Sequence, residues 1–504
     1  MVRVRISLTE DEKRSLLKIK VDKSFKTKTR VTKRTIEVAK AFGIGVDDEK
    51  VFHVFRDFEI DVNPGDIIYV TGESGSGKSI LLKALARELS KHDEFGGVIM
   101  DQEIEVNPNE ILIHGVGGNA SEAMKILSMV GLNEAYLFVR RYRELSEGQK
   151  YRYKLAKAFW SGRKTIIFDE FCSTLDRVTA KIVAYLAQKF CRKTGRTLIV
   201  ATTHEDLLED LNPNLLIRKS FGSSVEVVSL KPHSKPCSIL RKIRIEEGSY
   251  QDYKQLAVFH YIGKSPGYIR KIFRAIAELD ERRELAGVIV YAHPYLDLSA
   301  RNLAIPELKM LRKRLGAKKY AKFIDENFSR ISRVIVHPKY RGIGLGTMLV
   351  RETLPLAGTP YVEALAVMAR YNPFFEKAGM KRVEYESKTE HAISRALGEL
   401  EALGIDPNLI NSKKYLRKTL SKMPRRMLRR AARIIAEIAA AKFRRSQIEK
   451  IKGLEIEAMV KVLSEIRAKP EYFIWRNPAS TFTGKVHIKP KVECTFTHPS
   501  ENKI

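Results

Sequence analysis

Short apolar runs alternate with amphipathic segments in the first half of the chain. The apolar runs at 67–71, 165–168 and 198–202 are typical of buried parallel strands, and residues 79–90 and 147–160 have helical spacing. This alternation predicts an α/β domain.

A second alternation follows residues 231–236, where Lys-Pro-His-Ser-Lys-Pro favours a linker. Strands are expected at 287–292 and 334–336, and helices at 345–353 and 373–378. From about residue 396 the spacing becomes helical.

A chain of 504 residues is too long for one ordinary hydrophobic core, so we expect an α/β multidomain protein. The expected segments are a basic N-terminal segment (1–50), an α/β domain (51–230), a linker (231–245), an α+β domain (246–395), a basic helical extension (396–470) and a tail without assigned structure (471–504).

A glycine-rich loop joins the strand predicted at 67–71 to the helix that follows it. It reads Gly72-Glu73-Ser74-Gly75-Ser76-Gly77-Lys78-Ser79, the GxxxxGK[ST] pattern of a phosphate-binding loop. Glycines let backbone N–H groups curl around phosphate oxygens, Lys78 supplies charge for the β- and γ-phosphates, and Ser79 offers a hydroxyl to Mg²⁺. We expect ATP to be bound by Gly72, Ser74, Gly75, Gly77, Lys78 and Ser79.

Three later elements extend this site. The strand 165–168 ends in Asp169, a candidate Mg²⁺ ligand, and Glu170, a candidate base that polarises the attacking water. Leu-Ser-Glu-Gly-Gln at 145–149 opens a helix, and His204 follows the strand at 198–202.

The order of these motifs resembles the ABC-type ATPases over about residues 50–225. The resemblance implies a head-to-tail homodimer in which Ser146, Gly148 and Gln149 of one copy close over ATP on the other. It also implies a D-loop at 173–176 and a switch role for His204. The family's glutamine loop is expected near 111–118, which contains no glutamine, and Gln102 is an earlier and weaker substitute.

A second glycine-rich segment follows the strand at 334–336. Arg341-Gly342-Ile343-Gly344-Leu345-Gly346 opens a helix and can hold a pyrophosphate through successive backbone N–H groups. Further on, the chain reads Asn372-Pro373-Phe374-Phe375-Glu376-Lys377-Ala378-Gly379-Met380.

These two segments resemble the GNAT acyltransferase superfamily over roughly residues 250–390. The resemblance implies transfer of an acetyl group from acetyl-CoA to an amine. It assigns the coenzyme to Val336, Arg341, Gly342, Gly344, Gly346 and Asn372.

The sequence identifies the residues for the acyl transfer itself less clearly than those that bind the coenzyme. Phe375 stands where many members of the superfamily carry an acidic tyrosine, and Tyr371 is a candidate replacement. Candidate bases are Glu363 and Asp297, with His293 and His260 as further possibilities.

Charge points to a polyanionic partner. Lys and Arg number 91 against 60 Asp and Glu, a net charge of +31. Glu437 is the one acid among the Lys and Arg residues of 413–445. We predict nucleic-acid binding, with RNA favoured over DNA, by 413–445 and the N-terminal basic segment. A solvated basic surface or a helix lying on a membrane is the alternative.

No apolar run is long enough to span a membrane, and the N-terminus does not resemble a signal peptide. The cysteines Cys172, Cys191, Cys237 and Cys494 are scattered, which argues against disulfides or zinc and favours a cytoplasmic protein.

The sequence as a whole predicts an ATP-hydrolysing, acetyl-CoA-dependent acetyltransferase acting on an amine of a nucleic-acid base, with tRNA the favoured substrate. One alternative is a protein or small-amine N-acetyltransferase with a regulatory ATPase. Another is a non-catalytic ABC ATPase that binds nucleic acid.

Overall fold

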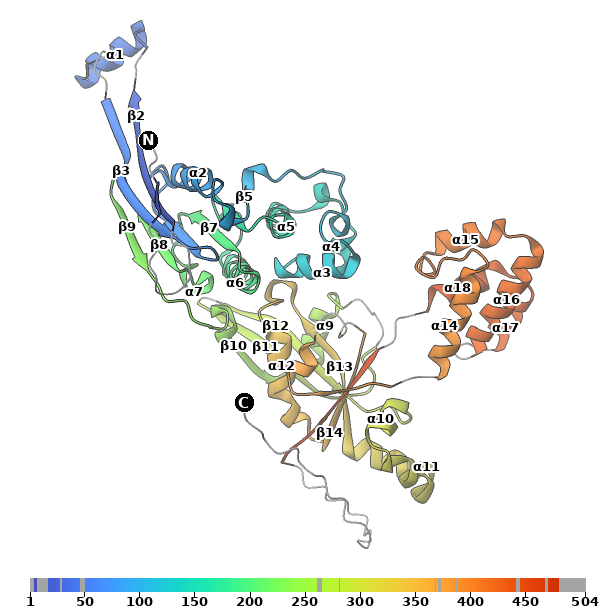
Figure 1. Ribbon diagram of the computed structural model, residues 1–504. Coiled ribbons are helices and arrows are strands. Elements are labelled where there is room, and N and C mark those ends of the chain that lie inside the picture. Colours follow the sequence, from blue (N-terminus) through green and yellow to red (C-terminus); the bar gives the residue numbers. More distant parts are fainter. Residues whose placement is uncertain are drawn as a thin grey trace. The chain divides into compact units, whose positions relative to one another are not determined.

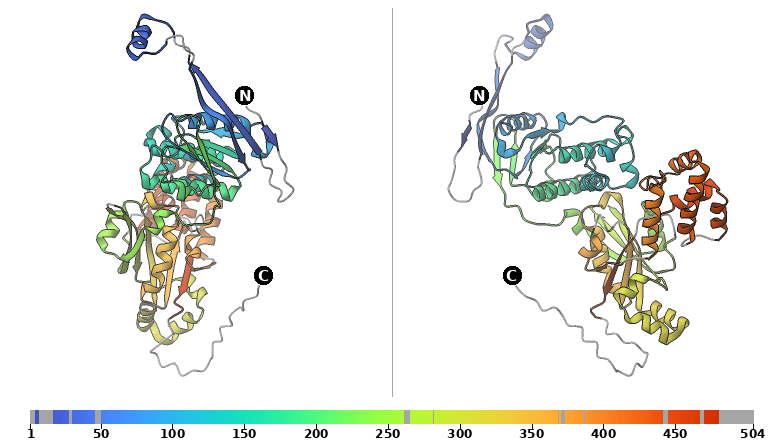
Figure 2. Two further views of the ribbon diagram at one scale, coloured as in Figure 1. Left: turned by 90° about the vertical axis from the view of Figure 1, so that its left-hand side faces the viewer. Right: turned by 45° about the vertical axis from the view of Figure 1, so that its right-hand side comes forward.

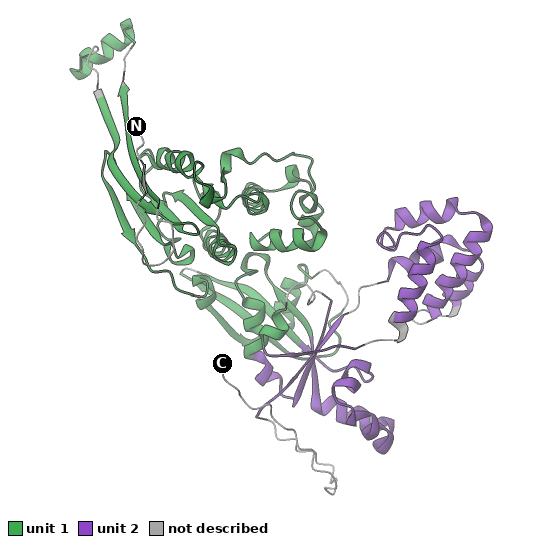
Figure 3. Ribbon diagram, viewed as in Figure 1, with its two compact units in different colours: residues 1–290, 332–352, 368–378 green, residues 291–331, 353–367, 379–504 purple. Residues whose placement is uncertain are grey.

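The computed structural model describes residues 4–6, 17–27, 30–45, 50–260, 265–280, 282–367, 369, 373–385, 388–440, 445–466 and 470–479 (Figure 1). The chain divides into two compact units (Figure 3). Unit 1 comprises residues 1–290, 332–352 and 368–378, and unit 2 comprises 291–331, 353–367 and 379–504. In the described part of the chain, no helix has the length and apolar character needed to cross a membrane.

A six-stranded sheet forms the centre of the first half of unit 1. Its order is β5 (Val98–Met100), β6 (Thr165–Phe168), β7 (Thr197–Thr202), β4 (Ile67–Thr71), β8 (Leu215–Lys219) and β9 (Val225–Ser229). All neighbouring pairs are parallel except β8 and β9. Every residue of β4, β6 and β7 is buried, which explains their continuous apolar runs and confirms the predicted strands.

Helices accompany this sheet. They are α2 (Lys78–Leu89), α3 (Ala120–Met129), α4 (Ala135–Phe138), α5 (Glu147–Trp160), α6 (Arg177–Thr194) and α7 (Leu208–Leu211). Helix α5 has the predicted bounds, and α2 begins one residue earlier than predicted.

The N-terminal segment forms a three-stranded antiparallel sheet. Its order is β1 (Val4–Ile6), β2 (Leu17–Thr27) and β3 (Lys50–Val62). The inner ends of β2 and β3 are buried through residues such as Ile19 and Val62. Their outer ends form a protruding ribbon with α1 (Lys33–Phe42) at its tip (Figures 1 and 2).

A second sheet has seven strands. The order is β10 (Ile243–Glu247), β11 (Ile269–Leu279), β12 (Arg282–Ala292), β13 (Phe328–Val336), β14 (Tyr361–Ala366), β16 (Glu471–Arg476) and β15 (Lys381–Val383). Strands β13 and β14 are parallel, and β16 is antiparallel to both β14 and β15. The unit boundaries fall within β12 and β13.

The remaining helices complete both units. Those of unit 1 are α8 (Ser238–Arg241), α9 (Tyr250–Ala257), α12 (Leu345–Thr353, whose last residue falls in unit 2) and α13 (Phe374–Lys377). Those of unit 2 are α10 (Ser299–Ala304), α11 (Glu307–Asn327), α14 (Lys388–Glu401), α15 (Lys413–Lys422), α16 (Arg425–Ala440), α17 (Arg445–Lys452) and α18 (Ile456–Ser464).

Helices α14 to α18 share a hydrophobic core of their own, which includes Leu400, Leu416, Ile435 and Met459. They lie in the sequence between the paired strands β15 and β16. The sequence left residues 471–504 without structure, but the first six of them form β16, where Tyr472 and Phe473 are buried. Residues 480–504, including Cys494, lie outside the described residues.

Candidate functional site

The carboxyl ends of β4, β6 and β7 lie at one edge of the six-stranded sheet, because these strands are parallel and in register. Thr71 pairs with Thr202, so the glycine-rich loop after β4 and His204 after β7 begin at the same edge. Open α/β sheets bind ligands at this edge.

Lys78 is held over the loop that precedes it. Its Nζ donates to the carbonyl oxygens of Gly72 and Glu73, both at 2.7 Å. Burial lowers the pKa of the Lys78 ammonium, whereas the charges of Asp169 and Glu170 raise it. The ammonium is therefore hydrogen-bonded to the loop and within electrostatic reach of the two carboxylates predicted to act with it.

Two glycines make the loop possible. Gly72 and Gly77 have φ angles of +143° and +104°, and a Cβ atom at either would overlap Lys219 or Val54. Ser76 is buried, and its Oγ has no hydrogen-bond partner in the described part of the chain. An unpartnered hydroxyl within an anion-binding loop fits a phosphate oxygen.

Asp169 and Glu170 follow β6 directly. The Glu170 N–H donates to Asp169 Oδ1 at 3.0 Å, and Glu170 has a left-handed φ of +47°. A non-glycine residue in this region is strained, and such strain is common at functional sites. Glu170 is exposed at the sheet edge, and together with Ser79 the carboxylates supply the oxygen ligands that Mg²⁺ prefers.

Gln102 lies in the turn that follows β5. Met100, the last residue of β5, pairs with Ile167, and Gln102 belongs to a 3₁₀ turn (Asp101–Glu103) directly after it. The neighbouring Asp101 accepts a hydrogen bond from the Asp169 N–H at 3.3 Å. Burial raises the pKa of Asp101, while that hydrogen bond lowers it.

The segment expected to carry the glutamine loop lies elsewhere. Residues 111–118 include a 3₁₀ turn (Leu112–His114), and Leu112 and Val116 pack in the hydrophobic core. The geometry thus favours Gln102. The signal that identifies it is the short strand β5 just before it, which the sequence reading missed.

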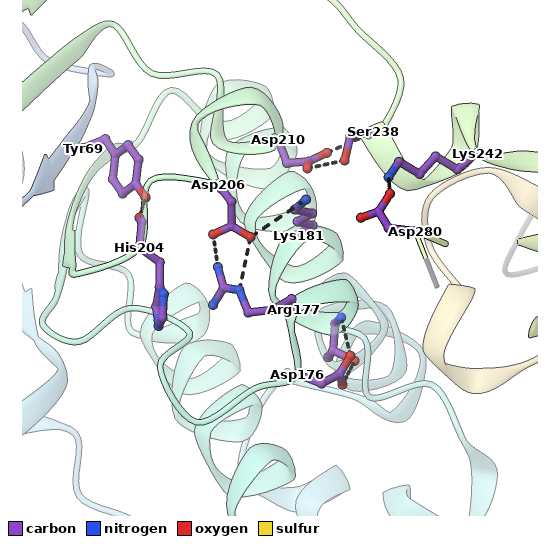
Figure 4. Close-up of polar contacts among 11 residues, drawn as sticks. Tyr69, Asp176, Arg177, Lys181, His204, Asp206, Asp210, Ser238, Lys242 and Asp280 are labelled. Atoms are coloured by element: carbon purple, nitrogen blue, oxygen red, sulfur yellow. Dashed lines mark hydrogen bonds and ion pairs between the residues drawn. The ribbon is translucent and has the colours of Figure 1, made fainter. Parts of the chain in front are cut away.

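His204 is fixed through its backbone. The Tyr69 hydroxyl donates to its carbonyl oxygen (Figure 4). The His204 N–H donates to Thr202 Oγ1 at 3.3 Å. Asp206, two residues on, accepts from Arg177 Nε at 3.1 Å at the start of α6. The segment after β7 is thereby tied to the helix that follows the predicted D-loop.

The predicted signature loop forms the start of α5. Ser146 caps the helix, its N–H donating to Gln149 Oε1 at 3.1 Å and its Oγ accepting from the Gln149 N–H at 3.4 Å. A Cβ atom at Gly148 would lie 3.0 Å from Leu175 of the D-loop. Ser146 itself is exposed, so a second copy of the chain can reach it.

Comparison with known proteins identifies the type of domain that this part of the chain forms. Residues 55–173 match the ABC transporter family model. This segment is an ABC-type ATPase domain. It has the α/β P-loop fold of that family.

The chain is similar to the methionine import ATP-binding protein MetN of Clostridium tetani, with 28% identity over 209 residues, 35% of this chain and 62% of the relative. For MetN of Streptococcus pyogenes serotype M6 the values are 27% over 201 residues, 32% and 56%. The chain therefore spans less than two thirds of these relatives. Among solved structures, the dimeric bacterial ABC transporter cassette MJ0796 aligns with a TM-score of 0.30 and 19% identity, over 36% of this chain and 94% of that one.

The second glycine-rich loop also lies in unit 1. Gly342 and Gly344 have left-handed φ angles of +87° and +101° before α12. The Arg341 guanidinium donates to backbone carbonyls, from Nε to Val336 at 2.8 Å and from Nη1 to Asn133 of the ABC domain at 2.9 Å. Its side chain therefore anchors the loop, and the backbone N–H groups of the loop are the candidates for a pyrophosphate.

Of the residues predicted for acyl transfer, some lie outside the described residues, one is buried and others lie at the surface. Tyr371 and Asn372 lie outside the described residues. Glu363 is 1% exposed, and its two oxygens accept from Arg301 at 2.6 and 2.9 Å and from Tyr472 at 3.1 Å. Its carboxylate is therefore engaged in a buried ion pair rather than being a free base.

The other candidates lie at the surface of unit 2. Asp297 pairs with Arg312, and His293 Nδ1 lies 2.5 Å from Asp325 Oδ1. The sequence could not predict these pairs, because the partners come from a different element, α11.

Proposed function

We propose that residues 51–230 bind Mg²⁺-ATP and hydrolyse it in a head-to-tail homodimer of a cytoplasmic protein. The observation that carries this proposal is the position of Glu170, exposed on a left-handed turn beside Asp169 at the sheet edge where the Lys78 loop also begins. Lys78 and the loop N–H groups bind the phosphates. Ser79 and Asp169 would hold Mg²⁺, which would supply positive charge to the phosphates.

In the hydrolytic step Glu170 accepts a proton from the attacking water. The oxygen of that water bonds to the γ-phosphorus as the bond to the β,γ-bridging oxygen breaks, which yields ADP and phosphate. Gln102 and His204 are placed to orient the water and the γ-phosphate. Ser146 and Gly148 of a second copy close the site.

We further propose that residues 246–395 bind acetyl-CoA and transfer its acetyl group to an amine. The left-handed glycines before α12 support a pyrophosphate site. Pairing of β13 with β14 ends at Ile331, although β13 continues to Val336. This separation of β13 from β14 supports binding of an extended chain that carries amide groups, as coenzyme A does, along the last residues of β13.

The helical module supports a nucleic-acid acceptor. Helix α16 buries Ala431, Ile435 and Ile438 and exposes Arg residues on its other side. These exposed residues are Arg425, Arg426, Arg429, Arg430 and Arg433. Such a surface is stabilised when phosphates neutralise it, and RNA is the favoured partner.

Contacts within unit 1 support a mechanical role for ATP. The loop before α12 contacts α6 at Leu186, which would lie 3.1 Å from a Cβ atom at Gly342, and contacts the segment after α3 through the Arg341–Asn133 hydrogen bond. Movement of α6 relative to α3 on ATP binding would change this loop. ATP would thus regulate when coenzyme or substrate is bound and released.

The experiment combines two assays on the full chain. Glu170→Gln should lower ATP hydrolysis by about 10²–10⁴-fold while retaining ATP binding, since only the base is lost. Labelled acetyl-CoA should transfer its label to RNA in a mixture of RNA, DNA and protein. Label in protein alone would favour the protein acetyltransferase, and failure to bind acetyl-CoA would favour a non-catalytic nucleic-acid-binding ATPase.

The names of the relatives favour a second candidate, the ATP-binding subunit of an importer. Co-purification with a membrane protein, together with ATP hydrolysis stimulated by that protein and not by RNA, would support it.

A further inference from the structure

An apolar pocket of about 660 Å³ lies in unit 2. It is bounded by α11 and by the first residues of β13 and β14, and its apolar lining comprises Ile305, Leu308, Leu311, Phe323, Phe328 and Tyr361. Helix α11 is broken at Gly316, where φ is +73° and ψ is +166°, so residues on both arms of the helix contribute. The volume lies within the range of small-molecule sites.

Aromatic rings form one wall of the pocket. Phe328 and Tyr361 occupy directly paired positions of β13 and β14, and their rings stack with centroids 4.9 Å apart and planes 15° apart. The Arg301 guanidinium lies 5.0 Å from the centre of the Phe328 ring and is fixed by its ion pair with Glu363. Phe328 is 1% exposed and therefore supports this wall from behind, so the half-buried Tyr361 supplies the ring surface on which a nucleobase can stack.

Polar groups of two kinds complete the lining. Glu307 offers a carboxylate, the acceptor that pairs with an exocyclic base amine, and its charge acts on the Tyr361 hydroxyl. Lys313 and Arg314 are exposed and offer cations to a phosphate backbone. A simple alkyl chain would need neither of these features.

The surface of α11 around the pocket is basic. Its exposed cations are Lys309, Arg312, Lys313, Arg314, Lys318, Lys319 and Lys322, against the acids Glu307, Asp325 and Glu326. Arg312 is paired with Asp297 of the preceding loop. The excess of cations favours a polyanion over a neutral or cationic ligand.

We infer that this pocket binds an unstacked base of a nucleic-acid strand whose phosphates lie along α11. The base stacks on the Tyr361 ring, which Phe328 supports, and Glu307 accepts a hydrogen bond from its amine. The inference rests on the proposed function in naming this base as the acceptor, but binding itself needs neither ATP nor acetyl-CoA.

The test uses the full chain and a fluorescein-labelled single-stranded RNA, compared with the same strand carrying abasic sites at its centre. Wild-type protein should bind the intact strand about tenfold more tightly, the contribution of roughly one stacked base. Met310→Glu places a charge at the pocket, where Met310 is 76% exposed, and should abolish this difference. Leu303→Glu is the matched control, because Leu303 is 49% exposed on α10 and does not line the pocket, and it should preserve the difference.

Equal affinity for intact and abasic strands, or equal effects of the two glutamate substitutions, would overturn the inference. A third result would also overturn it: cis-parinaric acid, a fluorescent fatty acid, binds, Met310→Glu weakens that binding, and RNA binding shows no dependence on the base. That result would assign the pocket to apolar chains. Base-dependent binding without any acetyl transfer would keep the pocket and reject the transferase. If the acetyl group is transferred to RNA and Met310→Glu does not change that transfer, the transferase is kept and the pocket is rejected.

Discussion

Lys339 of the turn after β13 places its Nζ 3.6 Å from Oδ1 of Asp176, the residue that caps α6. The same ammonium lies 3.1 Å from Glu284 on β12, and the Glu284 carboxylate also accepts a hydrogen bond from Tyr340. The predicted D-loop and the predicted coenzyme loop are thus joined by one side chain within unit 1.

Lys339→Met removes this link without shortening the side chain greatly. If the two loops are coupled, acetyl-CoA changes the rate of ATP hydrolysis in the wild type, and the substitution should reduce that response by about fivefold, the lower end of usual coupling energies. The measurement is steady-state phosphate release with and without acetyl-CoA.

Lys322→Met serves as the control, because Lys322 is 75% exposed and pairs with Glu326 one turn away. An unchanged response in Lys339→Met would show that this ion pair does not transmit the coupling.

Arg301→Met should be strongly destabilising. It leaves the Glu363 carboxylate buried without its cation, which costs about 3–5 kcal/mol. Adding Glu363→Gln removes the orphaned charge and keeps a partner for the Tyr472 hydroxyl, so the double variant should regain most of the loss. Thermal unfolding of the wild type and the two variants measures the effect, and a double variant no more stable than Arg301→Met would contradict the explanation.

Neutralising three arginines on one face of α16 should weaken the salt dependence of RNA binding. Arg426, Arg429 and Arg433 are spaced i, i+3, i+7 and are exposed. Their replacement by Gln should lower the slope of log K against log[salt] by roughly 0.7 per lost phosphate contact, about 2 in total. Fluorescence anisotropy with single-stranded RNA at several salt concentrations gives the slope.

The matched control replaces three basic residues of α2 and the turn after it by Gln, at Lys83, Arg87 and Lys91, which are also exposed. A slope change as large in this control would assign the effect to net charge rather than to α16.

Asp101→Asn should stabilise the ABC domain at neutral pH. Burial raises the pKa of Asp101 in the folded state, so its contribution to stability is present below the usual pKa near 3.8 and is lost as pH rises through the raised value. Asn keeps an oxygen for the Asp169 N–H and does not ionise. The gain in melting temperature should therefore be largest near pH 7 and shrink toward pH 4.

The exposed Asp93→Asn is the comparison for this pH series. Equal gains at pH 4 and pH 7 for Asp101→Asn would show that the buried charge is not their cause.

The sequence by itself determined the elements that depend only on residues close together along the chain. The strands β4, β6 and β7 are buried on both faces and read as continuous apolar runs, and the phosphate loop needs glycines at Gly72 and Gly77 whatever surrounds it. For the same reason α5 and α12 have their predicted bounds, since capping and amphipathic spacing act within a few residues.

Only the tertiary structure decided the contacts between distant segments. Glu363 reads as an available base on a strand, yet Arg301, sixty-two residues earlier, fills both of its oxygens. Gln102 became a site candidate through the hydrogen bond between its neighbour Asp101 and the Asp169 N–H, and Glu471–Arg476 became a strand because β14 offers it a buried edge. Pairing across a sheet and burial of a charge depend on which segments meet in space, and residue spacing along the chain does not specify that.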